Sequence, residues 1–166
     1  MCGVLGIYSL DSNMLDVGKK SSALDTLNHR GPDDYGIYQD DSIFLGHTRL
    51  SILDVQSGQQ PMISNDKRFV IAYNGEIYNY LELRSQLSKL DVQFTTHSDT
   101  EVILKCVENF GPYETLKRLE GMFAFVVWDK LQNQLFIARD RMGEKPMYYA
   151  FVSNTLIFSS EIKAIL

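Results

Sequence analysis

The chain has 166 residues, of which 45% are hydrophobic and 22% charged, and its formal net charge is −5. This length and composition are typical of one globular domain with a substantial core. An acidic surface does not attract a nucleic-acid backbone or an anionic membrane, so we expect neither as the main partner. The two cysteines, Cys2 and Cys106, are too few for a disulfide framework and suit a reducing cytosol, so we expect a cytoplasmic protein.

The first segment, residues 3–10, contains β-branched and aromatic residues between glycines and predicts a strand. This apolar start has no basic region before it and reaches Asp11 after only ten residues. It is therefore neither a signal peptide nor a membrane span.

Helical and strand-like segments follow as far as residue 75. A loose apolar stripe predicts a helix over residues 17–28, ended by Gly31-Pro32. Runs typical of strands come next, at residues 36–39, 42–47, 49–53 and 68–73. Asn74-Gly75 is a frequent hairpin signal, so we expect the last of these strands to end there at a turn.

Two helices and two hairpins are predicted in the second half. Leu83, Leu87 and Leu90 form a helical stripe. Ser98 with Glu101 three residues later is a capping box that opens a second helix, which Gly111-Pro112 stops. The two β-hairpins pair residues 122–128 with 134–139, and residues 148–152 with 155–159.

Strands near both ends with helices between them favour an α+β fold with two stacked, mainly antiparallel sheets. The strand at residues 122–128 is apolar at nearly every position. Such a strand is buried on both faces, which indicates sheets covered by helices. The last residues, 161–166, show neither a helix cap nor a polar tail, so we expect the natural chain to be longer.

Cys2 is the first candidate for catalysis. If Met1 is removed, Cys2 carries both a thiol and a free α-amine, whose ordinary pKa is about 7.7–8.0. A nucleophile and its general base then belong to one residue. If Met1 remains, the amine is a peptide N–H and the chain is expected to be inactive. The alternative interpretation is a small apolar residue that begins a buried strand.

A substrate site would need further groups. The amide of Asn74 and the backbone N–H of Gly75 are two donors that suit a developing oxyanion, unless they only form a hairpin turn. Arg49 and Asp99 suit the carboxylate and ammonium of an amino acid. Their alternatives are a surface salt bridge and a first-turn acid that complements the helix dipole.

Six motifs occur together in a fixed order. They are Cys2-Gly3, His29-Arg30-Gly31-Pro32-Asp33, Thr48-Arg49-Leu50-Ser51-Ile52, Tyr73-Asn74-Gly75-Glu76-Ile77-Tyr78-Asn79, Ser98-Asp99-Thr100-Glu101 and Arg139-Asp140-Arg141-Met142-Gly143-Glu144-Lys145-Pro146. Through them, the chain resembles the class II glutamine amidotransferase (glutaminase) domain of glutamine-hydrolysing asparagine synthetases over essentially all of residues 1–166. Within this resemblance, the strings Arg49-Leu50-Ser51-Ile52 and Asn74-Gly75-Glu76-Ile77-Tyr78-Asn79 favour the asparagine synthetase branch over the glucosamine-phosphate synthase and phosphoribosyl-pyrophosphate amidotransferase branches.

The resemblance implies the four-layer αββα fold of N-terminal-nucleophile hydrolases. It also implies that Cys2 attacks the glutamine side chain, forms a γ-glutamyl thioester and releases ammonia, after which water frees glutamate. Asn74 and Gly75 would form the oxyanion hole, and Arg49 would bind the substrate carboxylate. The other substrate-binding residues implied are Leu50, Ile52, Leu53, Glu76 and Asp99.

The resemblance further implies a C-terminal synthetase domain that uses ATP and magnesium to amidate aspartate and receives the ammonia. The Ser-Gly-Gly-x-Asp-Ser loop of that domain does not occur in these 166 residues, so no cofactor is expected here. Glutamine and the synthetase domain are the expected partners, and a homodimer is left open. Two alternatives also stay open: delivery of nitrogen to another acceptor, such as a sugar or polysaccharide precursor, and a catalytically silent regulatory domain.

Other candidates for chemistry are weaker. His29, His47 and His97 show no metal-ligand spacing, so no metal site is expected. Cys106 lies in the apolar stripe of its helix and is expected to be inert. The charged cluster Arg139-Asp140-Arg141 is expected to be structural or to face another domain.

Overall fold

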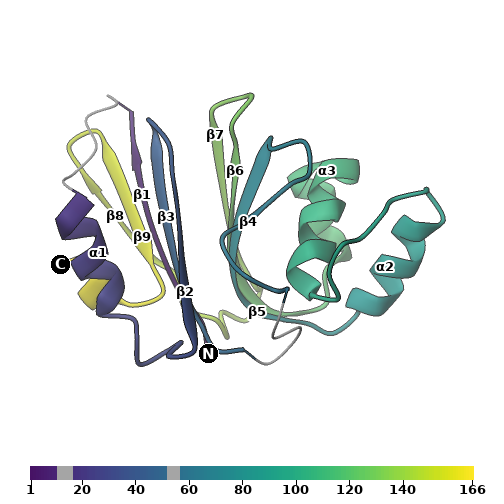
Figure 1. The fold of residues 1–166 in the computed structure, drawn as a ribbon, viewed down its shortest axis with the longest axis horizontal. Helices are drawn as coiled ribbons and strands as arrows, with labels where there is room; N and C mark the ends of the chain where they lie inside the picture. The colour runs from purple at the N-terminus through teal and green to yellow at the C-terminus, as the bar shows by residue number, and fades with distance from the viewer. Residues whose placement is uncertain (11–16, 52–56) are drawn as a thin grey trace.

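The computed structural model describes residues 1–10, 17–51 and 57–166. Two antiparallel β-sheets lie face to face, with helix α1 outside one sheet and helices α2 and α3 on the outer side of the other (Figure 1). The result is a four-layer arrangement of helix, sheet, sheet and helix. The α+β fold with stacked antiparallel sheets therefore agrees with the prediction.

The five-stranded sheet has the N-terminal strand at its centre. Its strand order is β2-β3-β1-β9-β8, and every neighbouring pair is antiparallel. The strands span Gly3–Ser9 (β1), Asp34–Gln39 (β2), Ile43–Arg49 (β3), Tyr148–Val152 (β8) and Thr155–Ser159 (β9). Because β1 is paired on both sides, the chain leading into it from Cys2 is firmly placed.

The four-stranded sheet has the order β4-β5-β6-β7. Its strands span Met62–Ile63 (β4), Phe69–Ile77 (β5), Gly121–Asp129 (β6) and Gln134–Arg139 (β7). The predicted hairpins β6–β7 and β8–β9 are both confirmed.

The helices span Val17–Asp25 (α1), Tyr80–Ser88 (α2) and Asp99–Arg118 (α3), with a short 3₁₀ helix, η1, at Ile162–Ala164. The hydroxyl of Ser98 accepts the Glu101 N–H at 3.2 Å and caps α3 as predicted. Gly111, at φ +76°, interrupts α3, but helical turns resume after it. None of the helices in the described parts of the chain is both long and apolar enough to cross a membrane.

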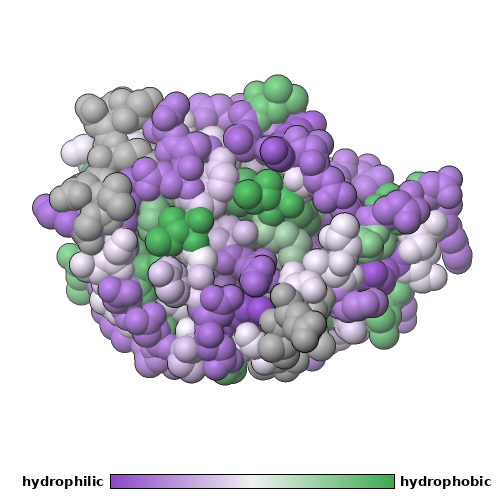
Figure 2. Space-filling view, viewed as in Figure 1, coloured by the Kyte–Doolittle hydropathy of each residue, from purple (hydrophilic) through white to green (hydrophobic). Residues whose placement is uncertain are grey.

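The core of the described residues lies in three layers: between α1 and the five-stranded sheet, between the two sheets, and between the four-stranded sheet and the helices α2 and α3. Side chains of β5 alternate between the last two of these layers. Val70 and Ala72 pack between the sheets with Trp128 of β6, whereas Ile71 and Tyr73 pack toward the helices. Hydrophobic side chains are visible over the middle of the molecule, where the sheets face each other, and hydrophilic ones surround them (Figure 2).

Two strand predictions were wrong. Asn74-Gly75 does not form a turn, because β5 continues through both residues to Ile77 and pairs them with Ala124 and Phe123 of β6. A glycine fits position 75 because a Cβ there would overlap the carbonyl oxygen of Met122 on the neighbouring strand.

The predicted strand at residues 49–53 is also absent where it can be checked. Arg49 is the last residue of β3, and residues 50 and 51 belong to no strand. Residues 52 and 53 lie outside the described residues. The helix predicted over 17–28 ends earlier, at Asp25, and Leu90 lies beyond the end of α2, where it is exposed.

Candidate active site

A cavity of about 290 Å³ opens where the N-terminus meets the ends of β3, β5 and α3. Its size suits a ligand as small as an amino acid. It gathers all of the predicted site residues that the structure describes. Those lining it are Cys2, Arg49, Leu50, Asn74, Gly75, Glu76 and Asp99. The remaining two, Ile52 and Leu53, lie outside the described residues.

The thiol of Cys2 is partly buried at the start of β1. Its Sγ lies 3.5 Å from the backbone nitrogen of Leu50 and 3.8 Å from the Leu50 carbonyl oxygen. Burial raises the pKa of the Cys2 thiol, and the Leu50 hydrogen bond and the nearby positive charges do not reverse this effect. The thiol is therefore protonated at neutral pH and needs a base to act as a nucleophile.

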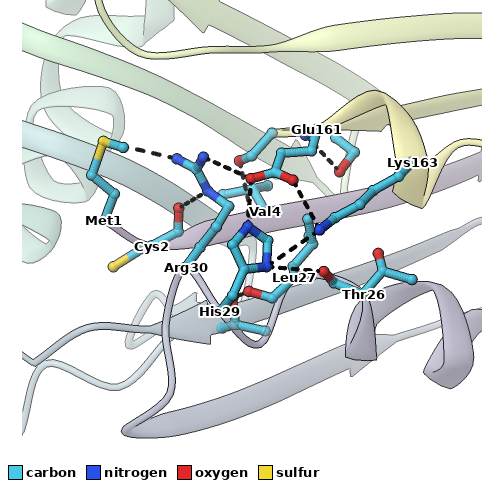
Figure 3. Close-up of polar contacts among 12 residues, drawn as sticks. Met1, Cys2, Val4, Thr26, Leu27, His29, Arg30, Glu161 and Lys163 are labelled. Carbon is cyan, nitrogen blue, oxygen red and sulfur yellow. Dashed lines mark hydrogen bonds and ion pairs between the residues drawn. The ribbon is translucent and has the colours of Figure 1, made fainter.

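The backbone of Cys2 is held by Arg30, whose Nε donates to the Cys2 carbonyl at 3.0 Å. Figure 3 shows Arg30 between Cys2 and Glu161, with its Nη1 3.1 Å from Glu161 Oε1. His29 Nε2 and Lys163 Nζ approach the same carboxylate, at 2.8 and 3.3 Å. Partial burial would raise the pKa of Glu161, but these three partners lower it to about 2. Glu161 is therefore an anion at neutral pH.

Asn74 contributes an unsatisfied donor. Its side chain is almost fully buried, and its Nδ2 has no hydrogen-bond partner within the described residues. A buried amide without a partner costs stability unless a ligand or water accepts from it. Since Asn74 lines the cavity beside Cys2, the amide is placed for an acceptor atom of a bound molecule.

A buried histidine fixes the strand that carries Asn74. His47 on β3 is fully buried, and its Nε2 lies 2.9 Å from the carbonyl oxygen of Tyr73 on β5. Burial lowers the pKa of His47 to about 4, so the ring is neutral at neutral pH and Nε2 carries the proton. His47 thereby joins the two sheets one residue before Asn74.

The cavity wall also holds groups of opposite charge. Arg49, at the end of β3, and Asp99, the first residue of α3, are both buried. The Asp99 carboxylate accepts the Tyr73 hydroxyl at 2.7 Å and the Ile77 N–H at 3.2 Å, both through Oδ2. Burial raises the pKa of Asp99 even though these hydrogen bonds favour its charged form.

Residues that were not singled out as site residues also line the cavity, among them Gln60, Tyr73 and Lys145. Gln60 Oε1 accepts the Tyr73 N–H at 2.7 Å. Lys145 is placed by a loop in which its own N–H donates to Asp140 at 3.0 Å. Tyr73 and Lys145 both belong to the quoted motifs, which was the sequence signal for their importance. Gln60 had no such signal, because its place in the cavity depends on long-range folding.

The remaining candidates fall outside the cavity. Cys106 is buried in α3, and burial raises the pKa of its thiol to about 12, as suits an inert core residue. Arg139 donates to the backbone carbonyls of Lys145 and Gly143, so it has the structural role expected. No group of three or more His, Cys, Asp or Glu residues in the described ranges could hold a metal ion.

A family model described as a glutamine amidotransferase domain matches residues 1–166. The chain therefore belongs to the glutamine amidotransferase domain family, which agrees with the resemblance found in its motifs.

Curated relatives align along the whole chain and are named as asparagine synthetases. Asparagine synthetase B [glutamine-hydrolyzing] of Escherichia coli (strain K12) is 41% identical over 167 residues, 99% of this chain and 30% of that protein. A putative asparagine synthetase of Methanocaldococcus jannaschii is 42% identical over 187 residues, and asparagine synthetase 1 of Bacillus subtilis (strain 168) is 38% identical over 170. Both alignments cover 100% of this chain, but only 35% and 27% of the relatives. The chain thus spans about a third or less of these relatives.

Among solved structures, the fold is similar to that of glutamine phosphoribosylpyrophosphate amidotransferase from B. subtilis, complexed with ADP and GMP. The TM-score is 0.82 at 22% identity, and the match covers 99% of this chain and 43% of that one. At this identity the similarity concerns the fold alone, and it agrees with the predicted four-layer αββα arrangement of two stacked antiparallel sheets.

Proposed function

We propose that this domain hydrolyses glutamine to glutamate and ammonia through a γ-glutamyl thioester on Cys2. One observation carries the proposal: a cavity of amino-acid size joins the Cys2 thiol to an unpaired Asn74 amide and to the opposite charges of Arg49 and Asp99. Membership of the glutamine amidotransferase family supports the same substrate.

The charged wall of the cavity recognises the amino-acid end of glutamine. The Arg49 guanidinium binds the α-carboxylate, because its planar donors match a carboxylate in pairs. Asp99, together with Glu76, binds the α-ammonium. Backbone groups of residues 50, 52 and 53 complete the binding site.

The chemistry then proceeds in two displacements. The Cys2 amine takes the thiol proton, and Sγ forms a bond to the amide carbon of glutamine, whose oxygen becomes an oxyanion bound by Asn74 and Gly75. The C–N bond breaks as the amine returns the proton to the leaving nitrogen, which departs as ammonia. Water then attacks the thioester carbon, glutamate leaves, and the sulfur regains a proton.

This mechanism requires that Met1 is removed. Met1 lines the same cavity as Cys2, and its Sδ lies 4.0 Å from Arg30 Nη2. While Met1 is attached, the nitrogen of Cys2 belongs to a peptide bond and cannot act as a base. Removal of Met1 supplies the base and clears part of the cavity.

We assign residues 1–166 to the glutaminase half of an asparagine synthetase. The relatives named as asparagine synthetases support this assignment, since each is about three times as long as this chain or longer. The ammonia would pass to an ATP-dependent domain that amidates aspartate. We expect the protein in the cytoplasm, where its two unpaired thiols stay reduced.

Glutamate release from glutamine tests the proposed function. The Met1-free chain should release glutamate and ammonia in equal amounts, and Cys2→Ala should abolish both. Cys106→Ala is the matched control: it removes the other thiol, which is buried in α3 away from the cavity, and should leave turnover intact. Turnover that survives Cys2→Ala, or a folded Met1-free chain without turnover, would refute the proposal.

A further inference from the structure

We propose that Tyr73 is a positioning residue that makes the site selective for substrates with an α-ammonium group, because its hydroxyl holds the Asp99 carboxylate in place. This inference rests on the proposed function and names a determinant of its substrate class. Tyr73 and Asp99 are 3% and 5% exposed, and the Tyr73 Oη lies 2.7 Å from Asp99 Oδ2.

Alternation along β5 explains how one strand serves two parts of the site. Tyr73 packs with the helix-side core, where α3 begins at Asp99. The next residue, Asn74, projects from the opposite face of the strand, because successive side chains alternate. β5 therefore contributes to two sides of the cavity. It carries the Asn74 amide on one side, and through the Tyr73 hydroxyl it holds the Asp99 carboxylate on another.

The backbone of Tyr73 is itself firmly held. Its N–H donates to Gln60 Oε1 at 2.7 Å, and its carbonyl accepts from His47 Nε2 at 2.9 Å. Both partners are buried side chains from outside β5. The phenol thus extends from a fixed point of the backbone, which lets it define the position of the carboxylate that it contacts.

The Asp99 carboxylate needs such support because burial disfavours its charged form. Oδ2 accepts both the Tyr73 hydroxyl and the Ile77 N–H. Two donors on one oxygen hold the carboxylate in place and favour its charged form, against the effect of burial. Without the hydroxyl, the carboxylate turns more freely and binds a proton more readily, and both changes weaken its attraction for an ammonium group.

The experiment compares glutamine with 4-carbamoylbutanoate, which is glutamine without its α-amino group. In the Met1-free protein, Tyr73→Phe should raise the KM for glutamine roughly tenfold, which is the usual worth of one hydrogen bond to a charged group. The kcat should stay within about twofold, since the thioester chemistry does not involve the phenol. The kcat/KM for 4-carbamoylbutanoate should be unchanged, so the preference for glutamine falls by the same roughly tenfold factor.

Tyr38→Phe is the matched control. The Tyr38 hydroxyl also donates to a carboxylate, that of Asp40, at 2.8 Å, but the pair lies on and beside β2 and does not line the cavity. This variant should leave the kinetics of both substrates unchanged. A second check uses Asp99→Asn, in whose background the further change Tyr73→Phe should not alter the preference for glutamine.

Each outcome decides between explanations. If Tyr73→Phe lowers kcat/KM equally for both substrates, Tyr73 has only a structural role and the inference is wrong. An unchanged preference for glutamine would contradict it equally. A roughly tenfold loss of the preference for glutamine in Tyr73→Phe, with no loss in the control Tyr38→Phe, supports the inference. If the unmodified Met1-free protein turns over neither substrate, the proposed function fails and this inference fails with it.

Discussion

The side chain of Asn74 is 2% exposed, yet its Nδ2 has no partner among the described residues. A folded protein rarely leaves such a donor unsatisfied, so we attribute it to the need to bind a ligand atom. The neighbouring Gly75 fits the same strand because a side chain would overlap β6. The unpaired Asn74 amide therefore lowers the stability of the fold, but it leaves a preorganised hydrogen-bond donor for a ligand in the site.

Asn74→Ala should lower kcat for glutamine hydrolysis by about 10²–10³-fold, because an oxyanion-hole donor acts mainly in the transition state. The KM should change by no more than a few-fold. Steady-state kinetics of the Met1-free variant would measure both constants. A loss confined to KM would show instead that Asn74 binds the ground state of the substrate.

At the scale of elements, His47 connects the sheets by linking β3 to the Tyr73 carbonyl of β5. This link is made one residue before Asn74, so the position of Asn74 relative to β3 depends on it. Because the ring is fully buried and has a pKa lowered from 6.5 to about 4, protonating it must weaken the fold. Below pH 6.5 the unfolded chain binds a proton that the folded chain excludes.

We therefore expect neutral His47 to make its full contribution to the free energy of unfolding above pH 6.5, and this contribution to disappear as the pH falls to about 4. The loss amounts to roughly 3 kcal/mol in the free energy of unfolding. Denaturant unfolding at several pH values would measure it, with His47→Gln as the comparison, since glutamine can donate to the carbonyl but does not titrate. If the free energy of unfolding depends on pH in the same way for the unmodified protein and for His47→Gln between pH 4 and 6.5, this prediction is wrong.

Local patterns in the sequence predict the local elements well. The hairpin strands β8 and β9 have the predicted bounds, because Ser153-Asn154 turns the chain between two strand-forming runs. The Ser98 cap correctly starts α3. Asn74-Gly75 was misassigned because the same dipeptide suits a hairpin turn and a glycine that packs closely against a neighbouring strand. Only the pairing with β6, more than 40 residues later, decides between the two.

The site was predicted from motifs, and its supporting residues were not. Arg49, Asn74 and Asp99 belong to short strings that resemble a known family, so their convergence on Cys2 could be expected. His47, Gln60 and Tyr73 act through contacts made only in the folded chain. Their roles follow from distances between sheets and helices, which composition and spacing do not encode.

The whole molecule brings its first and last strands together beside the cavity. Val4 and Ser160 exchange two hydrogen bonds of 2.9 Å, one through the Ser160 hydroxyl and one through its backbone N–H. Next to them, Arg30 joins the Cys2 carbonyl to Glu161 (Figure 3). Residues from both ends of the chain thus fix Cys2, while the second sheet and α3 supply the groups around it.

The most direct test is the mass of the N-terminal peptide from protein quenched in acid during glutamine turnover. We predict a peptide that begins at Cys2, without Met1, and carries the added mass of one γ-glutamyl group that hydroxylamine removes. Cys2→Ser should slow or abolish its formation, whereas Cys106→Ala should not affect it. Turnover by protein that retains Met1, or a glutamyl group attached to any residue other than Cys2, would contradict the proposed mechanism.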